Sequence, residues 1–300
     1  MTNTYIENHI YYTTEKDQSQ DNKVINLYKK HSAAAFKRTV SLTEAYMKLY
    51  KATDSHYYLR RAEAVKSCHD FALFRKYLDP DDTTELKKLN RCKNSLCTFC
   101  NWVDAKKRYS ILAATIEKLK NEGYKCIHCV ITVPNCNIEE LQEQINNLHK
   151  IIAKTLRHFK VNGYYRSTEI SYNKKNNTYH PHAHILITDY INIYQLEEFT
   201  GKEYKKLMPG YDKTYTICYI SKCNYVKELC KYITKPNDYN VEQLQDMIQN
   251  DAIYKVRKYA SGGIIKATYK ETETLIKTLT TAKRTELTLF GFYDMLVSLG

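Results

Sequence analysis

The sequence contains no apolar run close to the roughly 20 residues that a membrane-spanning helix needs. Its first residues, MTNTYIENHIYYTTEKDQSQDNK, are polar and do not resemble a signal peptide. These two absences predict a cytoplasmic protein with no membrane partner. Because disulfides are rare in the cytoplasm, the ten cysteines are not expected to form a disulfide framework, and clustered ones become candidate metal ligands.

Acidic residues are outnumbered by basic ones. Lys and Arg total 46 and Asp and Glu total 33, which gives a net charge of +13 and a pI of about 9.1. This excess favours a polyanionic partner, nucleic acid before an acidic membrane surface, although a protein can be basic without binding either. The 300 residues suffice for two modest domains, or for one domain with an extension.

Hydrophobic periodicity predicts an α+β core. Runs rich in β-branched residues indicate strands, and apolar residues three or four apart indicate helices. The expected elements are a strand at 125–134, a helix at 137–159, strands at 164–172 and 179–188, a helix at 194–208 and a strand at 214–221. This β-α-β-β-α-β order is ferredoxin-like, an antiparallel sheet with helices on one face. Further helices are expected at 41–51 (starting at Ser41), 102–123 and 224–234.

Three histidines alternate along the expected strand YHPHAHILIT at 179–188. Side chains of a strand alternate between its faces, so His180, His182 and His184 share one face. Imidazole is the commonest metal-ligating side chain. The pattern therefore favours a metal site over a set of partly exposed histidines that bind nothing.

The turn-rich NKKNN segment brings a carboxylate to the same face. If it closes a hairpin with Asn173 opposite Thr178, then Glu169 lies opposite His182. A slip of one residue would move Glu169 to the other face. Two imidazoles and a carboxylate suit a divalent ion with open positions, and Mg²⁺, Mn²⁺ and Zn²⁺ all fit this ligand set.

A second pattern lies in the expected helix at 224–234. Glu228 and Tyr232 are four residues apart and so share a helix face. A tyrosine hydroxyl can attack phosphorus once it loses its proton, and a carboxylate one turn away can activate water. Alone this spacing is weak evidence, because a solvated carboxylate beside a packing tyrosine is common in a tyrosine-rich chain.

Four cysteines have the spacing of a zinc site. Cys92, Cys97 and Cys100 form a C-x4-C-x2-C pattern, and Cys68 would supply the fourth thiolate of a structural Zn²⁺ site. His69 could replace Cys68 as a ligand, and buried free thiols are the alternative to zinc. The other cysteines are expected to pack in the core: Cys126, Cys129, Cys136, Cys218, Cys223 and Cys230.

In combination these motifs resemble those of the rolling-circle plasmid replication initiators, a family of HUH endonucleases. PHAHILI (181–187) resembles the metal-binding motif, and ITVPNCNIEEL (131–141) resembles the strand and turn that precede it. VKELCKYITK (226–235) resembles the Glu-x-x-x-Tyr motif of the branch found in small plasmids of Gram-positive bacteria. RKYASGGIIK (257–266) resembles the segment that closes those proteins, so that the resemblance covers about residues 67–266.

The resemblance implies a metal-dependent endonuclease that nicks and rejoins single-stranded DNA. Tyr232 would cut the plasmid origin, keeping a 5′-phosphotyrosine and releasing a 3′-OH primer, and Glu228 would activate water for the terminating cleavage. The implied ligands of Mg²⁺ or Mn²⁺ are His182, His184 and Glu169, with His180 as a further candidate. Candidates for phosphate contact are Lys107, Arg108, Lys231 and Lys235. Expected partners are duplex and single-stranded origin DNA, a host polymerase and a helicase, and dimerisation is left open.

The expected organisation is a disordered tail at 1–22, a helical, zinc-binding and DNA-binding region at 23–122, the nuclease domain at 123–240 and a C-terminal helical extension at 241–300. Two alternatives are left open. A transposase or conjugative relaxase could share the two-histidine core, but the Glu-x-x-x-Tyr spacing and the PNCN turn favour the plasmid branch. A non-catalytic, zinc-stabilised DNA-binding protein would lack metal-dependent cleavage of a single-stranded origin hairpin.

Overall fold

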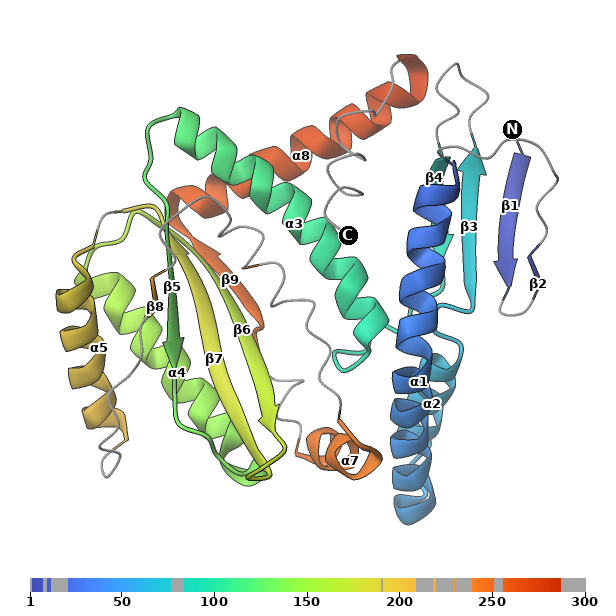
Figure 1. Cartoon of the computed structure of the whole chain (residues 1–300), viewed down its shortest axis with the longest axis horizontal. Helices are drawn as coiled ribbons and strands as arrows, with labels where there is room; N and C mark the ends of the chain where they lie inside the picture. The colour runs from blue at the N-terminus through green and yellow to red at the C-terminus, as the bar shows by residue number, and fades with distance from the viewer. Residues whose placement is uncertain are drawn as a thin grey trace. The chain divides into compact units, whose positions relative to one another are not determined.

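The computed structural model describes residues 2–7, 10–11, 21–76, 84–189, 191–208, 218–219, 229, 239–250 and 256–286. The chain divides into two compact units (Figure 1). Unit 1 comprises Met1–Lys106, Asn240–Gln245 and Lys277–Gly300, and unit 2 comprises Lys107–Tyr239 and Asp246–Ile276. Both contain helices and an antiparallel sheet, which confirms the α+β class. No helix among the described residues combines the length and apolarity that crossing a bilayer requires.

Unit 1 is built on two helices, α1 (Asp21–Thr53) and α2 (His56–Lys66). Helix α1 is far longer than the helix predicted at 41–51. Ser41 lies in its interior, where the Oγ donates to the Lys37 carbonyl oxygen at 3.2 Å, so Ser41 does not start the helix. The residues that precede Ser41 are helical because they pack against the rest of unit 1, as the buried side chains of Ala35 and Thr39 show. Local sequence therefore does not reveal where α1 begins.

Unit 1 also contains a four-stranded antiparallel sheet in the order β2-β1-β3-β4. Its strands are β1 (Thr2–Glu7), β2 (Ile10–Tyr11), β3 (Phe71–Lys76) and β4 (Thr84–Leu89). The sequence predicts a disordered tail over 1–22, but the structure pairs Thr2–Glu7 with β3 along its full length. The physical reason is that the edge of β3 offers unpaired backbone groups, and a polar segment can satisfy them.

Unit 2 contains a five-stranded antiparallel sheet in the order β8-β5-β7-β6-β9. In chain order the strands of this sheet and the two helices that connect them are β5 (Ile127–Thr132), α4 (Ile138–His158), β6 (Gly163–Asn173), β7 (Thr178–Ile187), α5 (Ile193–Leu207), β8 (Cys218–Tyr219) and β9 (Tyr259–Gly262). The β6–β7 hairpin pairs Asn173 with Thr178 and Glu169 with His182, so its predicted register is confirmed. The predicted helix at 224–234 lies outside the described residues except for Leu229, which is helical.

Apolar side chains cover both faces of this sheet. On one face, Cys129, Ile131 and Ile185 form a core with residues of α4 and α5 (Figure 1). On the other face, Leu186 of β7 packs with a cluster from α3 (Thr98–Asn121) and α8 (Gly263–Glu286). Helices therefore lie against both faces, whereas the sequence predicts them on one. The alternation of β7 explains this, since Ile185 and Leu186 are both buried but point in opposite directions.

Gly263, at the start of α8, provides a test of this packing. Its φ is +56°, and a Cβ there would lie 1.7 Å from the carbonyl oxygen of Asn162. Since a backbone oxygen cannot rotate away, Gly263→Ala is expected to lower the free energy of unfolding by about 3 kcal/mol. Gly201→Ala is the matched control, because nothing lies within 4 Å of that position in α5 and alanine favours a helix. Urea denaturation would measure both, and equal stability of the two variants would contradict the prediction.

Candidate functional site

The hairpin β6–β7 gathers three of the four candidate metal ligands. Glu169 lies opposite His182 in the ladder, and alternation puts His184 on the same face. The Glu169 Oε2 lies 3.4 Å from the His182 Nε2 and 3.9 Å from the His184 Nε2. All three ligand atoms lie within 4.8 Å of one another, as the ligands of a single ion do.

The surroundings of these side chains fit a cation. The side chains of Glu169, His182 and His184 are 9%, 13% and 4% exposed. Among the described residues, neither carboxylate oxygen of Glu169 has a hydrogen-bond partner. A buried carboxylate without hydrogen bonds is costly, and a bound divalent ion would offset that cost. Two imidazole nitrogens and one carboxylate oxygen are suitable ligands for Mg²⁺, Mn²⁺ or Zn²⁺.

His180, the fourth candidate, is not part of this group. Its ring Nε2 lies 2.8 Å from the Oγ1 of Thr132, and burial lowers its pKa. Its carbonyl oxygen lies 3.3 Å from the Nδ1 of His182. A carbonyl can only accept, so this hydrogen bond requires a proton on the Nδ1 of His182, and the Nε2 of the neutral ring would then be the nitrogen that can bind an ion. The backbone of His180 thus orients a candidate ligand, and its side chain does not join the group.

The structure adds one residue that sequence reasoning missed. His128 of β5 is completely buried, and its Nε2 lies 3.2 Å from the Nδ1 of His184. The two rings are stacked, with centroids 5.3 Å apart and an interplanar angle of 16°. The apolar run CIHCVIT indicates a buried strand, and the one histidine within it is the sequence feature that could have identified His128 as a functional candidate.

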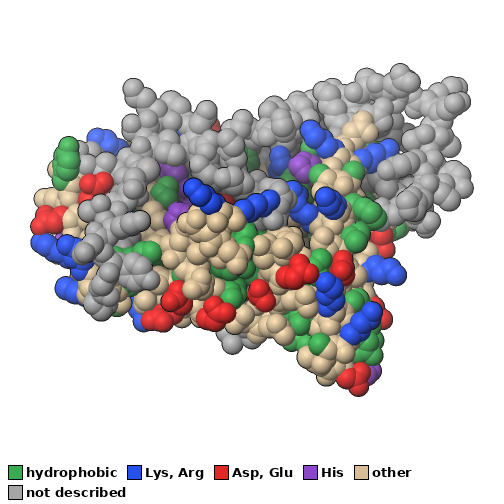
Figure 2. Space-filling view, turned by 60° about the horizontal axis from the view of Figure 1, so that its bottom comes forward, with side chains coloured by type: hydrophobic (Ala, Val, Ile, Leu, Met, Phe, Trp, Pro, Cys, Tyr) green, Lys and Arg blue, Asp and Glu red, His purple; other side chains and the backbone are tan. Residues whose placement is uncertain are grey.

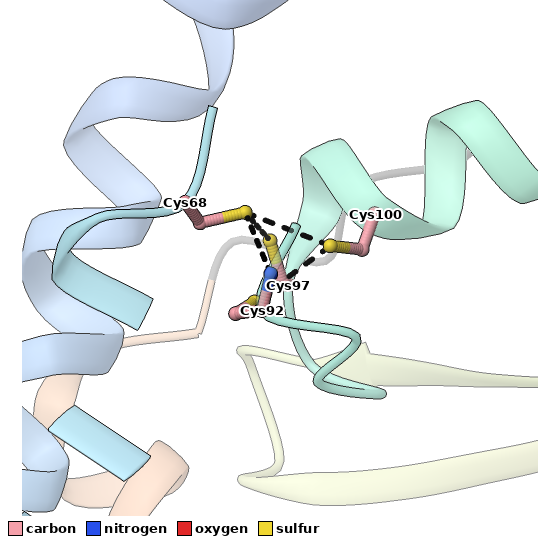
Figure 3. Close-up of side chains that lie close together, drawn as sticks. All are labelled: Cys68, Cys92, Cys97 and Cys100. Atoms are coloured by element: carbon pink, nitrogen blue, oxygen red, sulfur yellow. Dashed lines mark hydrogen bonds between the residues drawn. The ribbon is translucent and has the colours of Figure 1, made fainter. Parts of the chain in front are cut away.

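The four predicted zinc cysteines converge in unit 1 (Figure 3). The Sγ of Cys68 lies 3.7 Å from that of Cys97 and 3.6 Å from that of Cys100, and Cys92 lies 3.7 Å from Cys100. A tetrahedral site with Zn–S bonds of about 2.3 Å requires sulfur separations of about 3.8 Å, so the spacing fits Zn²⁺. Hydrogen bonds from the thiols of Cys68, Cys92 and Cys97 lower the pKa of Cys100, which favours a thiolate there.

His69, the alternative to Cys68, has another role. Its Nδ1 lies 2.8 Å from the Oγ of Ser32 and its Nε2 lies 3.0 Å from the Oγ1 of Thr39. Both ring nitrogens are thus hydrogen-bonded to α1, and burial lowers the pKa of the ring. The four-cysteine set is therefore the group that the structure assembles, and His69 ties α1 to the segment that carries Cys68.

A family model described as a replication protein matches residues 83–286. The chain belongs to this family. A "Protein rep" from Staphylococcus aureus is 30% identical over 208 residues, which cover 66% of this chain and 80% of that protein. The corresponding protein from Bacillus sp is 33% identical over 177 residues, which cover 55% of this chain and 53% of that protein.

A "Protein rep" from Streptococcus pneumoniae is 28% identical over 227 residues, which cover 68% of this chain and 69% of that protein. No solved structure matches the chain. Membership of the replication-protein family confirms the resemblance on which the sequence-based assignment depends. Both candidate metal groups, apart from Cys68, lie within the matched residues.

The structure describes two of the four basic residues that are expected to contact phosphate in this replication protein. Lys107 lies 3.7 Å from Glu273, and the Arg108 guanidinium lies 4.2 Å from the centroid of the Tyr259 ring. Both cations thus have internal contacts. On the face drawn in Figure 2, acidic side chains lie among the Lys and Arg side chains, so the net charge of +13 does not form a uniform basic surface there.

Four further predicted residues lie outside the described part of the chain: Glu228, Lys231, Tyr232 and Lys235. Their described neighbour is Leu229, which is completely buried. Leu229 belongs to the cluster formed by Leu186 of β7 with α3 and α8. It therefore lies on the sheet face that carries His182 and His184.

Proposed function

We propose that this replication protein initiates rolling-circle replication of a plasmid by nicking one strand of the plasmid origin. The observation that carries the proposal is the buried group of Glu169, His182 and His184 on the face where Leu229 packs. Two imidazoles and a carboxylate would hold Mg²⁺ or Mn²⁺. When bound, such an ion polarises the scissile phosphate and stabilises the charge that develops on its oxygens.

Chain connectivity supports a position for Tyr232 near this group. Tyr232 follows Leu229 by three residues, so their Cα atoms are at most about 11 Å apart. Leu229 belongs to the same apolar cluster as Leu186, which is two residues from His184 along β7, or about 7 Å. This short connection supports the assignment of Tyr232 as the nucleophile that acts at the candidate metal group.

The roles of the chain's own residues follow from their chemistry. The Tyr232 hydroxyl loses its proton and its oxygen bonds to phosphorus, while the bond from phosphorus to the 3′ oxygen breaks. The products are a 5′-phosphotyrosine and a 3′-OH, which primes a host polymerase while a helicase separates the strands. When the origin is regenerated, Glu228 accepts a proton from water, the water oxygen bonds to phosphorus and the bond from phosphorus to the 3′ oxygen breaks, which leaves a 5′ phosphate and a new 3′-OH.

The architecture is consistent with a ferredoxin-like nuclease domain at 123–240. The β-α-β-β-α-β order of β5 to β8 and the strand order β8-β5-β7-β6 both support that assignment. We assign contact with the origin duplex to the region at 23–122, where a zinc ion on Cys68, Cys92, Cys97 and Cys100 would hold the elements that carry basic residues. Phosphate contacts of this kind predict affinity that falls steeply with salt.

The test uses the full chain and its own plasmid origin as a single-stranded hairpin. With Mn²⁺ or Mg²⁺ we expect one nick at a fixed position, protein attached to the 5′ phosphate and a 3′ end that a polymerase extends. Without a divalent ion we expect no nick. Tight origin binding with no cleavage in either metal would contradict the proposal and favour a non-catalytic, zinc-stabilised DNA-binding protein.

A further inference from the structure

His128 lies behind the candidate metal group, in contact with His184, and belongs to none of the sequence motifs. In the ladder between β5 and β7, His128 is opposite Leu186 and His184 is opposite Val130. The two imidazoles are therefore diagonal neighbours on one sheet face, consistent with their 3.2 Å Nε2–Nδ1 contact. Both residues are buried, with 0% and 3% of their surface exposed.

The contact constrains where the protons lie. A neutral imidazole has one N–H donor and one acceptor nitrogen. The His184 Nε2 lies 3.9 Å from the Glu169 carboxylate, so it is the nitrogen available to an ion, and the proton must then be on the Nδ1. In that state the His184 Nδ1–H donates to the Nε2 of His128, and the proton of His128 lies on its own Nδ1.

We propose that His128 is a positioning residue that holds His184 in the tautomer and ring orientation required for binding the divalent ion. This inference rests on the proposed function, because it concerns the same metal group. An acceptor behind a ligating imidazole fixes its tautomer and raises its basicity, and its loss typically weakens metal binding about 10–100-fold.

The other histidine ligand is oriented in the same manner by a different acceptor. The Nδ1 of His182 donates to the carbonyl oxygen of His180, a backbone group that no substitution removes. The Nδ1 of His184 instead contacts a side chain, so its orientation depends on the identity of residue 128. The two ligands therefore differ in a way that mutagenesis can exploit.

In the experiment the full chain, with zinc already supplied to the cysteine group, is titrated with Mn²⁺. Binding is measured by calorimetry and, independently, by the EPR signal of free Mn²⁺. No DNA is present, so the readout is independent of nicking. H128L removes the acceptor and is expected to raise the Mn²⁺ dissociation constant about 10–100-fold. H128Q keeps an acceptor oxygen and is expected to restore most of the affinity.

His149 is the matched control, because it is another largely buried histidine of unit 2. Its Nε2 contacts the Oγ1 of Thr168, which pairs with Ala183 on the opposite sheet face from His184. H149Q is therefore expected to bind Mn²⁺ as the wild type does. A folded H128L protein with wild-type affinity would overturn the inference.

A second measurement does not depend on the folding of any variant. Long-range ¹H–¹⁵N spectra of Mg²⁺-loaded wild-type protein are expected to show His184 protonated at Nδ1 and His128 unprotonated at Nε2. A proton on the Nε2 of His128 would overturn the inference. Wild-type protein that binds no Mn²⁺ would overturn both this inference and the metal-dependent part of the proposed function. If the wild-type protein binds Mn²⁺ and nicks DNA, and H128L binds Mn²⁺ with the same affinity, this inference alone is overturned.

Discussion

Replacing Tyr232 with Phe is expected to abolish the covalent adduct between the protein and origin DNA. The substitution removes only the hydroxyl oxygen, so no bond to phosphorus can form, and the loss of nicking should be on the order of 10⁴-fold or more. A labelled single-stranded origin oligonucleotide incubated with Mn²⁺ and separated on a denaturing gel would measure it. The wild-type chain should give a slowly migrating labelled band, and the variant should give none.

Tyr225 provides the matched control for this experiment, because it precedes Tyr232 by seven residues, two helical turns, and would share its face of the expected helix. Tyr225→Phe is expected to keep the adduct. Glu228→Ala is expected to keep it too but to lose the water-dependent terminating cleavage. An adduct formed by Tyr232→Phe would show that the nucleophile has been assigned wrongly. Unchanged termination in Glu228→Ala would remove Glu228 from the role of base.

The geometry of the β6–β7 hairpin could be predicted from sequence because its causes are local. A short polar turn fixes which residues pair, and the two-residue period of a strand fixes which side chains share a face. Glu169 and His182 could therefore be placed opposite each other without knowledge of the rest of the sheet, and the ladder confirms it. The binding of an ion by these residues is a prediction that the titration addresses.

His128 could not be found in this way, because its contact with His184 spans 56 residues. Within β5 it reads as part of a buried strand, and only the neighbouring strand reveals its role. In the sheet β7 lies between β5 and β6, so the first strand of the core is adjacent to the third. The same strand order, applied to the predicted elements, would have brought the two histidines together.

The helices and strands of unit 1 have weak local signals in the sequence, and the reason is physical. Helix α1 continues through Ser41 because residues on both sides of Ser41 pack, and serine is equally compatible with a helix start and a helix interior. Strands β3 and β4 contain polar and basic residues, and they are strands because they pair with each other. Non-local pairing of this kind leaves no periodic signal in a short segment.

The second large effect is expected from the cysteine group. Cys100→Ser should lose the bound zinc and lower the free energy of unfolding of unit 1 by about 5 kcal/mol or more, since structural zinc supplies roughly 10–16 kcal/mol of apparent binding free energy in small zinc domains. Protein purified without chelator is expected to contain one zinc per chain, measured by metal analysis. Thermal unfolding followed by circular dichroism would report the loss of stability.

Cys126→Ser is the control for this variant, because Cys126 is a partly exposed thiol outside the group and its loss should leave the zinc content unchanged.

The large effect of Cys100→Ser follows from what the four sulfurs connect. Cys68 follows α2, Cys92 and Cys97 lie between β4 and α3, and Cys100 lies in the first turn of α3. An ion at this point cross-links two segments that are separate in sequence, the one that follows α2 and the one that leads from β4 into α3, and His69 extends the connection to α1. A stable Cys100→Ser protein, or wild-type protein with less than one zinc per chain, would show that buried thiols and packing alone hold unit 1 together.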